Sequence, residues 1–160
     1  MEKRIVVLGV GNILRGDDGL GVHAVELLRR EALPPRVALL DAGTMGIDLL
    51  YLIEDADYAI IIDALDAGAE PGATFRIPWE AIADHEPAAQ VASLHDYNLV
   101  TVLALAKKLG KMPQVVIYGV QPENTELGYA MSEAVTGALP GLVQSVKAEI
   151  REMGCNNVRA

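Results

Sequence analysis

The apolar run YAIIIDAL at residues 58–65 constrains the fold of this chain more than any other segment. Its apolar residues are continuous instead of alternating with polar ones. Such runs are typical of strands that are buried on both faces of a parallel sheet. The run therefore predicts a central strand of a parallel sheet.

Strand-like and helix-like patterns alternate along the rest of the chain. Apolar or alternating runs predict strands at residues 4–9, 36–42 and 114–120, and an edge strand at 73–79. Apolar spacing and helix-ending residues predict helices over 17–33, 46–55, 96–110 and 132–154, the last bent or restarted near Pro140. Residues 80–92 are expected to be irregular or to form a short helix. This alternation predicts an α/β sandwich with a mostly parallel sheet.

Length and composition limit the number of domains and the class of partner. The 160 residues are 51% hydrophobic, which suits one domain over residues 1–160, with a loose tail from about residue 153. The net charge is −9 and no Lys/Arg cluster occurs, so we expect no nucleic-acid partner. The single cysteine, Cys155, excludes a disulfide framework and a Cys-rich zinc site. The apolar run IVVLGV is too short to span a membrane, and we expect a cytoplasmic protein.

A glycine-rich turn, GVGNILRGDDGLGV at residues 9–22, follows the first predicted strand. Gly9 and Gly11 fit the dinucleotide fingerprint, but Leu14 stands where its third glycine belongs. Asp17 and Asp18 occupy the helix start where a pyrophosphate would bind, and their charge would repel it. Nucleotide binding is therefore disfavoured. Either acid could be a simple N-cap, but two adjacent acids exceed what a cap needs, so one could cap while the other points into a cleft.

Two other residues are candidates for chemistry near the same sheet edge. Asp63 ends the apolar run AIIID, where a buried carboxylate is costly unless it is paired or bound to a cation. The alternative is a structural Asp that is hydrogen-bonded to loop amides. His95 lies in SLHDYNL, where Ser93 and Asp96 resemble a capping box. A first-turn position would keep its imidazole neutral and able to bind a metal, although a surface or capping role is equally open.

Together Asp18, Asp63 and His95 would form an open site with mixed oxygen and nitrogen ligands. That set suits Zn²⁺, Ni²⁺ or Mn²⁺ better than Cu(I) or Ca²⁺. The sequence has neither a G-x-S-x-G nor an H-E-x-x-H motif, and Cys155 lies in a polar tail. A hydrolase built on this chain would therefore use water that is activated by a metal or a carboxylate.

Several segments resemble the hydrogenase maturation proteases and occur in the same order as in that family. They are LGVGNILRGDDGLGV, DAGTMGIDLL, IIIDALDAG, SLHDYNL and YGVQPE, and the resemblance runs from about residue 4 to about residue 152. It implies a single three-layer α/β/α domain with a twisted, mostly parallel sheet. It also implies a peptidase that removes a C-terminal extension from the large-subunit precursor of a [NiFe] hydrogenase after nickel insertion.

The same resemblance implies the roles of individual residues. Asp18, Asp63 and His95 match the family's metal ligands, with Asp17 as a cap or a support behind them. Asp41 matches a further acid near the cleft, as a possible support or base. The metal would be nickel carried by the substrate, although Zn²⁺ or Cd²⁺ could occupy the site in a crystal. The metal could activate water or only dock the substrate while a carboxylate acts as base. A monomer is favoured; the alternative function is a non-catalytic metal- or nucleotide-binding accessory protein.

Overall fold

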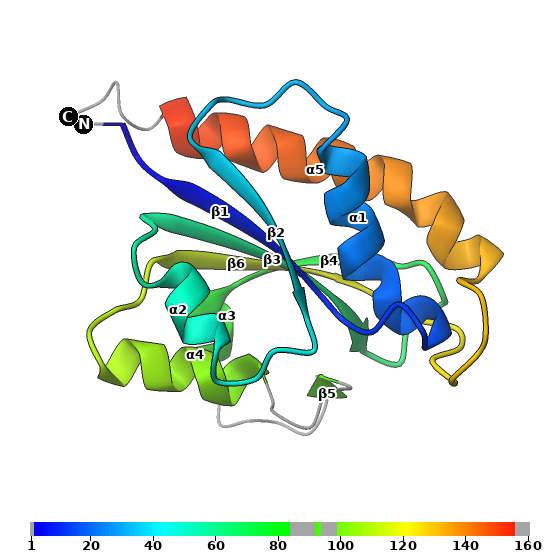
Figure 1. The fold of residues 1–160 in the computed structure, drawn as a ribbon. Coiled ribbons are helices and arrows are strands. Elements are labelled where there is room, and N and C mark those ends of the chain that lie inside the picture. Colours follow the sequence, from blue (N-terminus) through cyan, green and yellow to red (C-terminus); the bar gives the residue numbers. More distant parts are fainter. Residues whose placement is uncertain (1, 84–91, 94–98, 156–160) are drawn as a thin grey trace.

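The computed structural model describes residues 2–83, 92–93 and 99–155, which form a twisted sheet with helices on both faces (Figure 1). Strands β2, β1, β3 and β6 are parallel and adjacent in that order, and β4 pairs antiparallel with β6. A short strand, β5, pairs antiparallel with the end of β3. The strands are β1 (Ile5–Val10), β2 (Val37–Gly43), β3 (Tyr58–Asp66), β4 (Thr74–Pro78), β5 (Ala92–Ser93) and β6 (Gln114–Val120).

The helices form the two outer layers of the domain. Helices α1 and α5 cover one face of the sheet, and α2, α3 and α4 cover the other (Figure 1). The helices are α1 (Leu20–Leu28), α2 (Leu49–Ile53), α3 (Trp79–Ala83), α4 (Leu99–Lys108) and α5 (Glu133–Cys155), with a short 3-10 helix, η1 (Gly16–Gly19), before α1. The predicted α/β/α class is confirmed. Within the described residues, no helix is long and apolar enough to cross a membrane.

Strand β3 lies at the centre of the sheet, between β1 and β6, and only its last residue, Asp66, is exposed. Ile60 and Ile62 belong to the core cluster under α1 and α5, while Ile61 belongs to the cluster under α2 and α4. Successive side chains of a strand point to opposite faces, so a strand covered on both faces is apolar throughout. The prediction of a buried central strand is confirmed.

From β1 the chain adds β2 on one side of the sheet and then β3 on the other. The loops that follow β1, β2 and β3 therefore lie at the same edge of the sheet. Gly9 near the end of β1 pairs with Asp41 on β2 and with Ile62 on β3. The turn after β1 therefore starts between the carboxyl ends of β2 and β3. In open α/β sheets such a change of side creates a crevice outside the strand ends, where ligands bind.

Two predicted helices differ from the structure. The segment predicted as one helix over 17–33 starts as η1, whose four residues are all buried, and α1 ends at Leu28. The prediction for the last helix is a bend or a restart near Pro140. Helix α5 continues through Pro140 to Cys155, so the restart is wrong and the bend stays a prediction. Pro140 cannot donate a hydrogen bond to the Thr136 carbonyl, and both residues lie on the exposed side of α5. Helix α5 therefore tolerates the proline without ending.

An ion pair between a buried carboxylate and a half-exposed guanidinium joins α5 to the sheet. Arg76 on β4 donates two hydrogen bonds to Glu149 on α5, over 2.6 and 2.9 Å, and the Tyr118 hydroxyl donates a third over 2.7 Å. The hydrogen bonds from Arg76 hold the pKa of the Glu149 carboxyl below its ordinary value. Burial raises the pKa of the Tyr118 hydroxyl, which therefore stays protonated and remains a donor.

We expect Glu149→Gln to lower the free energy of unfolding at pH 7 by about 2 kcal/mol, because it weakens charge-assisted bonds to a half-exposed guanidinium. A carboxyl whose folded pKa is lowered stabilises the protein above its unfolded pKa, and this contribution fades as the pH falls through the folded pKa. The difference from wild type should therefore shrink below about pH 4.5. Urea unfolding at several pH values measures it, with the exposed Glu152→Gln as control. A difference that is independent of pH would contradict this account.

Candidate functional site

The glycines of the turn after β1 serve close backbone packing. Gly11 has φ 134°, and a Cβ there would lie 1.8 Å from the carbonyl oxygen of Asp18. A Cβ on Gly21 would lie 2.3 Å from the carbonyl oxygen of Ile62 and 2.5 Å from that of Val10. The chain's own backbone therefore fills the space beside these glycines. Their presence is explained without a phosphate, which argues against the nucleotide alternative.

Asp17 connects this turn to the loop between β6 and α5. Its buried carboxylate accepts hydrogen bonds from the backbone N–H groups of Glu123, Asn124 and Ser132, over 2.8, 3.1 and 2.7 Å. The Ser132 hydroxyl donates a fourth bond, over 2.8 Å. The residues at the N-cap positions of η1 and α1 are Arg15 and Gly19, so the interpretation of Asp17 as a cap of its own helix is wrong. Asp17 instead fixes the position of a second loop.

Asp18 and Asp63 are buried carboxylates on neighbouring segments. Asp18 is 4% exposed, and its Oδ2 accepts a hydrogen bond of 3.0 Å from the Asn12 N–H. Asp63 is fully buried, and its Oδ1 accepts a bond of 2.8 Å from the Ala64 N–H. Helix η1, which carries Asp18, contacts β3, which carries Asp63. Two carboxylates that are desolvated beside one sheet edge are costly as bare anions, and a cation would offset that cost.

His95, the third predicted ligand, lies outside the described residues. Strand β5 ends at Ser93, which pairs with Leu65 two residues after Asp63. The chain therefore runs along the end of β3 two residues before His95. Among residues 2–83, 92–93 and 99–155, no three His, Cys, Asp or Glu side chains are grouped so that they could hold a metal ion. The complete Asp18, Asp63 and His95 site stays a prediction.

Asp41 lies at the same edge but is exposed. Its Oδ1 accepts a hydrogen bond of 2.8 Å from the Gly43 N–H and so stabilises the end of β2. The Gly43 carbonyl in turn accepts a bond of 2.7 Å from the Gly11 N–H. Asp41 is therefore part of a loop that contacts the turn, and its role as a base stays a prediction.

Gln121 organises the loop after β3, a role that the sequence analysis missed. Its buried Oε1 accepts hydrogen bonds from the N–H groups of Ala67 and Ala69, over 2.8 and 3.2 Å, and its Nε2 donates to Asp66. The hydrogen bonds from Gln121 and from the Gly68 N–H lower the pKa of the Asp66 carboxyl. In the sequence, the available signal for this role was that Gln121, a polar residue, directly follows an apolar strand in the segment YGVQPE.

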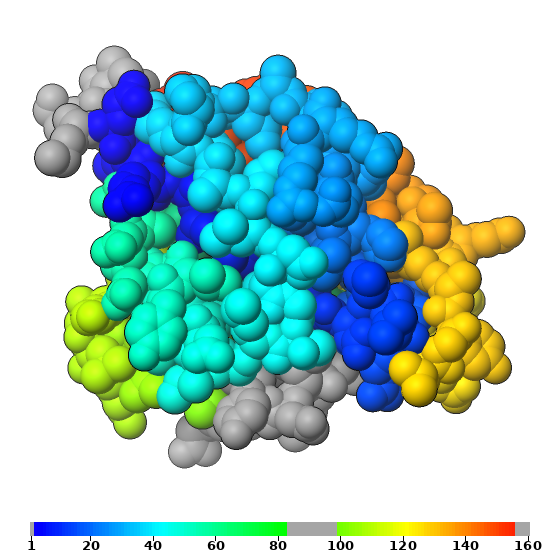
Figure 2. Space-filling view, viewed as in Figure 1, coloured from blue at the N-terminus to red at the C-terminus, as the bar shows by residue number. Residues whose placement is uncertain are grey.

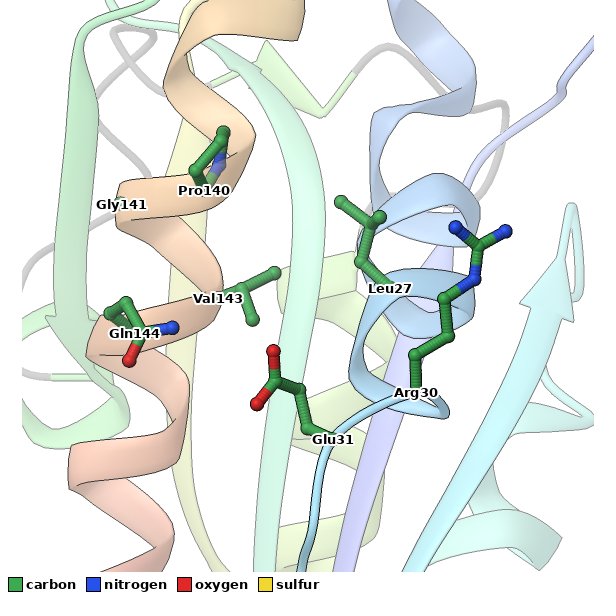
Figure 3. Close-up of a pocket in the computed structure, with 7 residues that line it drawn as sticks. All are labelled: Leu27, Arg30, Glu31, Pro140, Gly141, Val143 and Gln144. Atoms are coloured by element: carbon green, nitrogen blue, oxygen red, sulfur yellow. The ribbon is translucent and has the colours of Figure 1, made fainter.

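A cavity of about 420 Å³ lies away from these acids, between α1 and α5 (Figure 3). Its walls include Leu27 from α1, Arg30 just after α1, and Pro140 and Val143 from α5. Asp17, Asp18, Asp41 and Asp63, the predicted site residues that the structure describes, do not line it. The candidate site is therefore an edge of the sheet with loops around it, and it does not coincide with this cavity.

Comparison with known proteins identifies the class of protein that has this fold and these loops. The hydrogenase maturation protease family model matches residues 22–149, starting just after the turn that carries Asp18. The hydrogenase expression/formation protein HupD of Bradyrhizobium diazoefficiens is 41% identical over 127 residues, which are 78% of this chain and 66% of HupD.

Two solved structures have the same fold. The hydrogenase maturating endopeptidase HybD from Escherichia coli superposes with a TM-score of 0.79 at 32% identity, covering 94% of each chain. The [NiFe] hydrogenase maturation protease HycI from Thermococcus kodakarensis superposes with a TM-score of 0.76 at 30% identity, covering 93% of this chain and 92% of HycI. The present chain belongs to the hydrogenase maturation protease family, and it is a peptidase of that family. The resemblance noted from the motifs is confirmed.

The Asp17 carboxylate accepts four hydrogen bonds from Glu123, Asn124 and Ser132. We expect Asp17→Asn to lower the free energy of unfolding by about 2 kcal/mol, because an amide cannot accept all four bonds and its NH₂ group would face other donors. Urea unfolding of the variant measures the loss. The control is Asp48→Asn, an exposed acid at the start of α2 that makes no side-chain cap bond. Equal stabilities of the two variants would show that the Asp17 bonds do not hold the loops together.

Proposed function

We propose that this protein removes the C-terminal extension from the large-subunit precursor of a [NiFe] hydrogenase in the cytoplasm, and that it does so after nickel has been inserted. The observation that supports this most is the pair of buried carboxylates, Asp18 and Asp63, at the carboxyl edge of the sheet in a member of the hydrogenase maturation protease family. A cation brought by the substrate would offset the cost of burying them.

In this proposal Asp18, Asp63 and His95 bind the nickel that the precursor carries. The metal is therefore part of the substrate. Without it, the two acids and the imidazole lack the ion that joins them to the precursor. A precursor that carries nickel completes the coordination, so substrate recognition and the test for nickel insertion become one event.

Water is the proposed attacking group. Cys155 is exposed at the end of α5, whereas Asp63 lies towards the opposite edge of the sheet, where the β6–α5 loop begins. The Ser132 hydroxyl donates to Asp17 and accepts a bond of 3.3 Å from the Val135 N–H, so it is engaged in holding the start of α5. The bound nickel would polarise the scissile carbonyl, and Asp41 is the candidate base for the water.

We expect purified protein to shorten a nickel-loaded precursor and to leave a nickel-free precursor intact, because only the loaded form completes the metal site. Mass spectrometry of the precursor before and after incubation measures the change. Cleavage of both forms at equal rates would contradict nickel recognition. An intact loaded precursor, tested with its correct partner, would instead favour the non-catalytic alternative.

We expect Asp18→Asn, Asp63→Asn and His95→Ala each to slow processing by more than about 100-fold, because loss of residues that merely support metal ligands already costs up to that factor. Asn preserves the shape of Asp, so melting temperatures should stay near that of wild type. The control is Glu70→Gln, an exposed acid in the loop after β3. A variant that unfolds would assign a structural role to that residue.

A further inference from the structure

Four large apolar side chains are exposed on two loops beside the Asp18 turn. Ile13 and Leu14 follow β1 and are 56% and 63% exposed, and Leu127 and Tyr129 precede α5 and are 70% and 56% exposed. We call these four residues the Leu14 surface. Scattered apolar side chains are normal on a protein surface, but a contiguous group indicates an interaction site.

Backbone hydrogen bonds hold the two loops together. The Gly128 N–H donates to the Leu14 carbonyl over 2.9 Å, which places Leu14 opposite the residue between Leu127 and Tyr129. The Gly16 N–H donates to the Tyr129 carbonyl over 3.1 Å. Figure 2 shows the blue turn and the yellow loop next to each other on one face of the molecule. The four side chains therefore lie on adjoining, fixed backbones.

The surface is continuous with the candidate site. The Asn12 N–H donates to the Asp18 carboxylate, and Ile13 and Leu14 are the next two residues. The Asp17 carboxylate fixes the other loop through Glu123, Asn124 and Ser132. A large molecule bound at Asp18 would therefore extend over this surface.

Charged residues lie next to the apolar residues on both loops. Arg15, Glu123 and Glu126 are exposed on the same two loops, and the Arg15 Nε donates to the Thr125 carbonyl over 3.2 Å. An apolar centre with a polar rim is typical of protein–protein interfaces. The acidic residues and the net charge of −9 oppose binding of a phosphate backbone or an anionic lipid surface. These features favour a polypeptide partner.

We propose that the Leu14 surface docks an apolar segment of the large-subunit precursor next to the nickel site of that precursor. This inference rests on the proposed function, because it identifies the occupant by continuity with the metal-binding residues. The surface contributes binding energy that does not depend on the reacting bond. Because the loops are already ordered, little conformational entropy is lost when the precursor binds.

The surface is expected to affect binding of the precursor more than the chemical step. Interactions that are equal in the bound substrate and the transition state lower KM without changing kcat. We expect Leu14→Ser and Leu127→Ser each to raise the KM for nickel-loaded precursor about tenfold, the size of a moderate interface residue, and to leave kcat within about twofold. Both side chains are exposed, so thermal unfolding should match wild type.

Leu109→Ser is the matched control. Leu109 is 58% exposed just after α4, at the opposite edge of the sheet, before β6 begins. If Leu14→Ser and Leu127→Ser behave like Leu109→Ser while wild type cleaves the precursor, the docking proposal is wrong and the proposed function stands. If wild type does not cleave the loaded precursor, the proposed function fails. The docking proposal is then still tested by comparing the affinity of the precursor for wild type with its affinity for Leu14→Ser.

Sedimentation of wild type alone tests whether a second copy of this chain occupies the surface. Self-association that Leu14→Ser removes would overturn the proposal.

Discussion

The geometry of the candidate site depends on one buried carboxylate, that of Asp17. It accepts three backbone N–H groups and one hydroxyl from the loop between β6 and α5, although it lies more than 100 residues earlier in the chain. A buried carboxylate is tolerated only when donors surround it, so the turn and the loop must close together. The contact between the turn and the loop fixes the backbone next to Asp18. It also brings together the exposed apolar residues of the Leu14 surface. The metal-binding prediction and the docking proposal therefore rest on the same four hydrogen bonds.

Asp18 and Asp63 lie where β3 and η1 meet. The Asp18 carboxylate accepts a hydrogen bond from the Asn12 N–H, and the Asp63 carboxylate accepts one from the Ala64 N–H. The apolar strand excludes water from Asp63, and the close approach of Gly21 to Ile62 brings the turn onto β3. Low polarity raises the cost of the bare anion and also strengthens the interaction of a carboxylate with a cation. A buried acid near the carboxyl end of an apolar strand, such as Asp63 on β3, is thus suited to binding an ion.

The sequence alone could predict the layers of the fold, but it could not predict the hydrogen bonds that position the site. The apolar run at 58–65 and the alternation of elements were sufficient for the sheet and its covering helices, because burial on two faces leaves a pattern in the residues themselves. The partners of Asp17 and Gln121 leave no such pattern, since most of them are backbone amides of other loops, and a backbone amide has no residue-specific signature. The sequence left a bend and a restart at Pro140 open for a related reason: whether a helix continues through a proline depends on the surroundings of the carbonyl that loses its hydrogen bond, and tertiary packing decides that.

The two parts of the proposed recognition have separate tasks. An apolar surface cannot distinguish a precursor that carries nickel from one that does not, because the ion changes nothing in an apolar contact. Discrimination must therefore come from Asp18, Asp63 and His95, whose interaction with the precursor exists only when the metal is present. The Leu14 surface would add the same binding energy to both forms and so raise the affinity without changing the ratio between them. Under this proposal the apolar contact would bring the precursor to the site, and the metal ligands would decide whether it is cut.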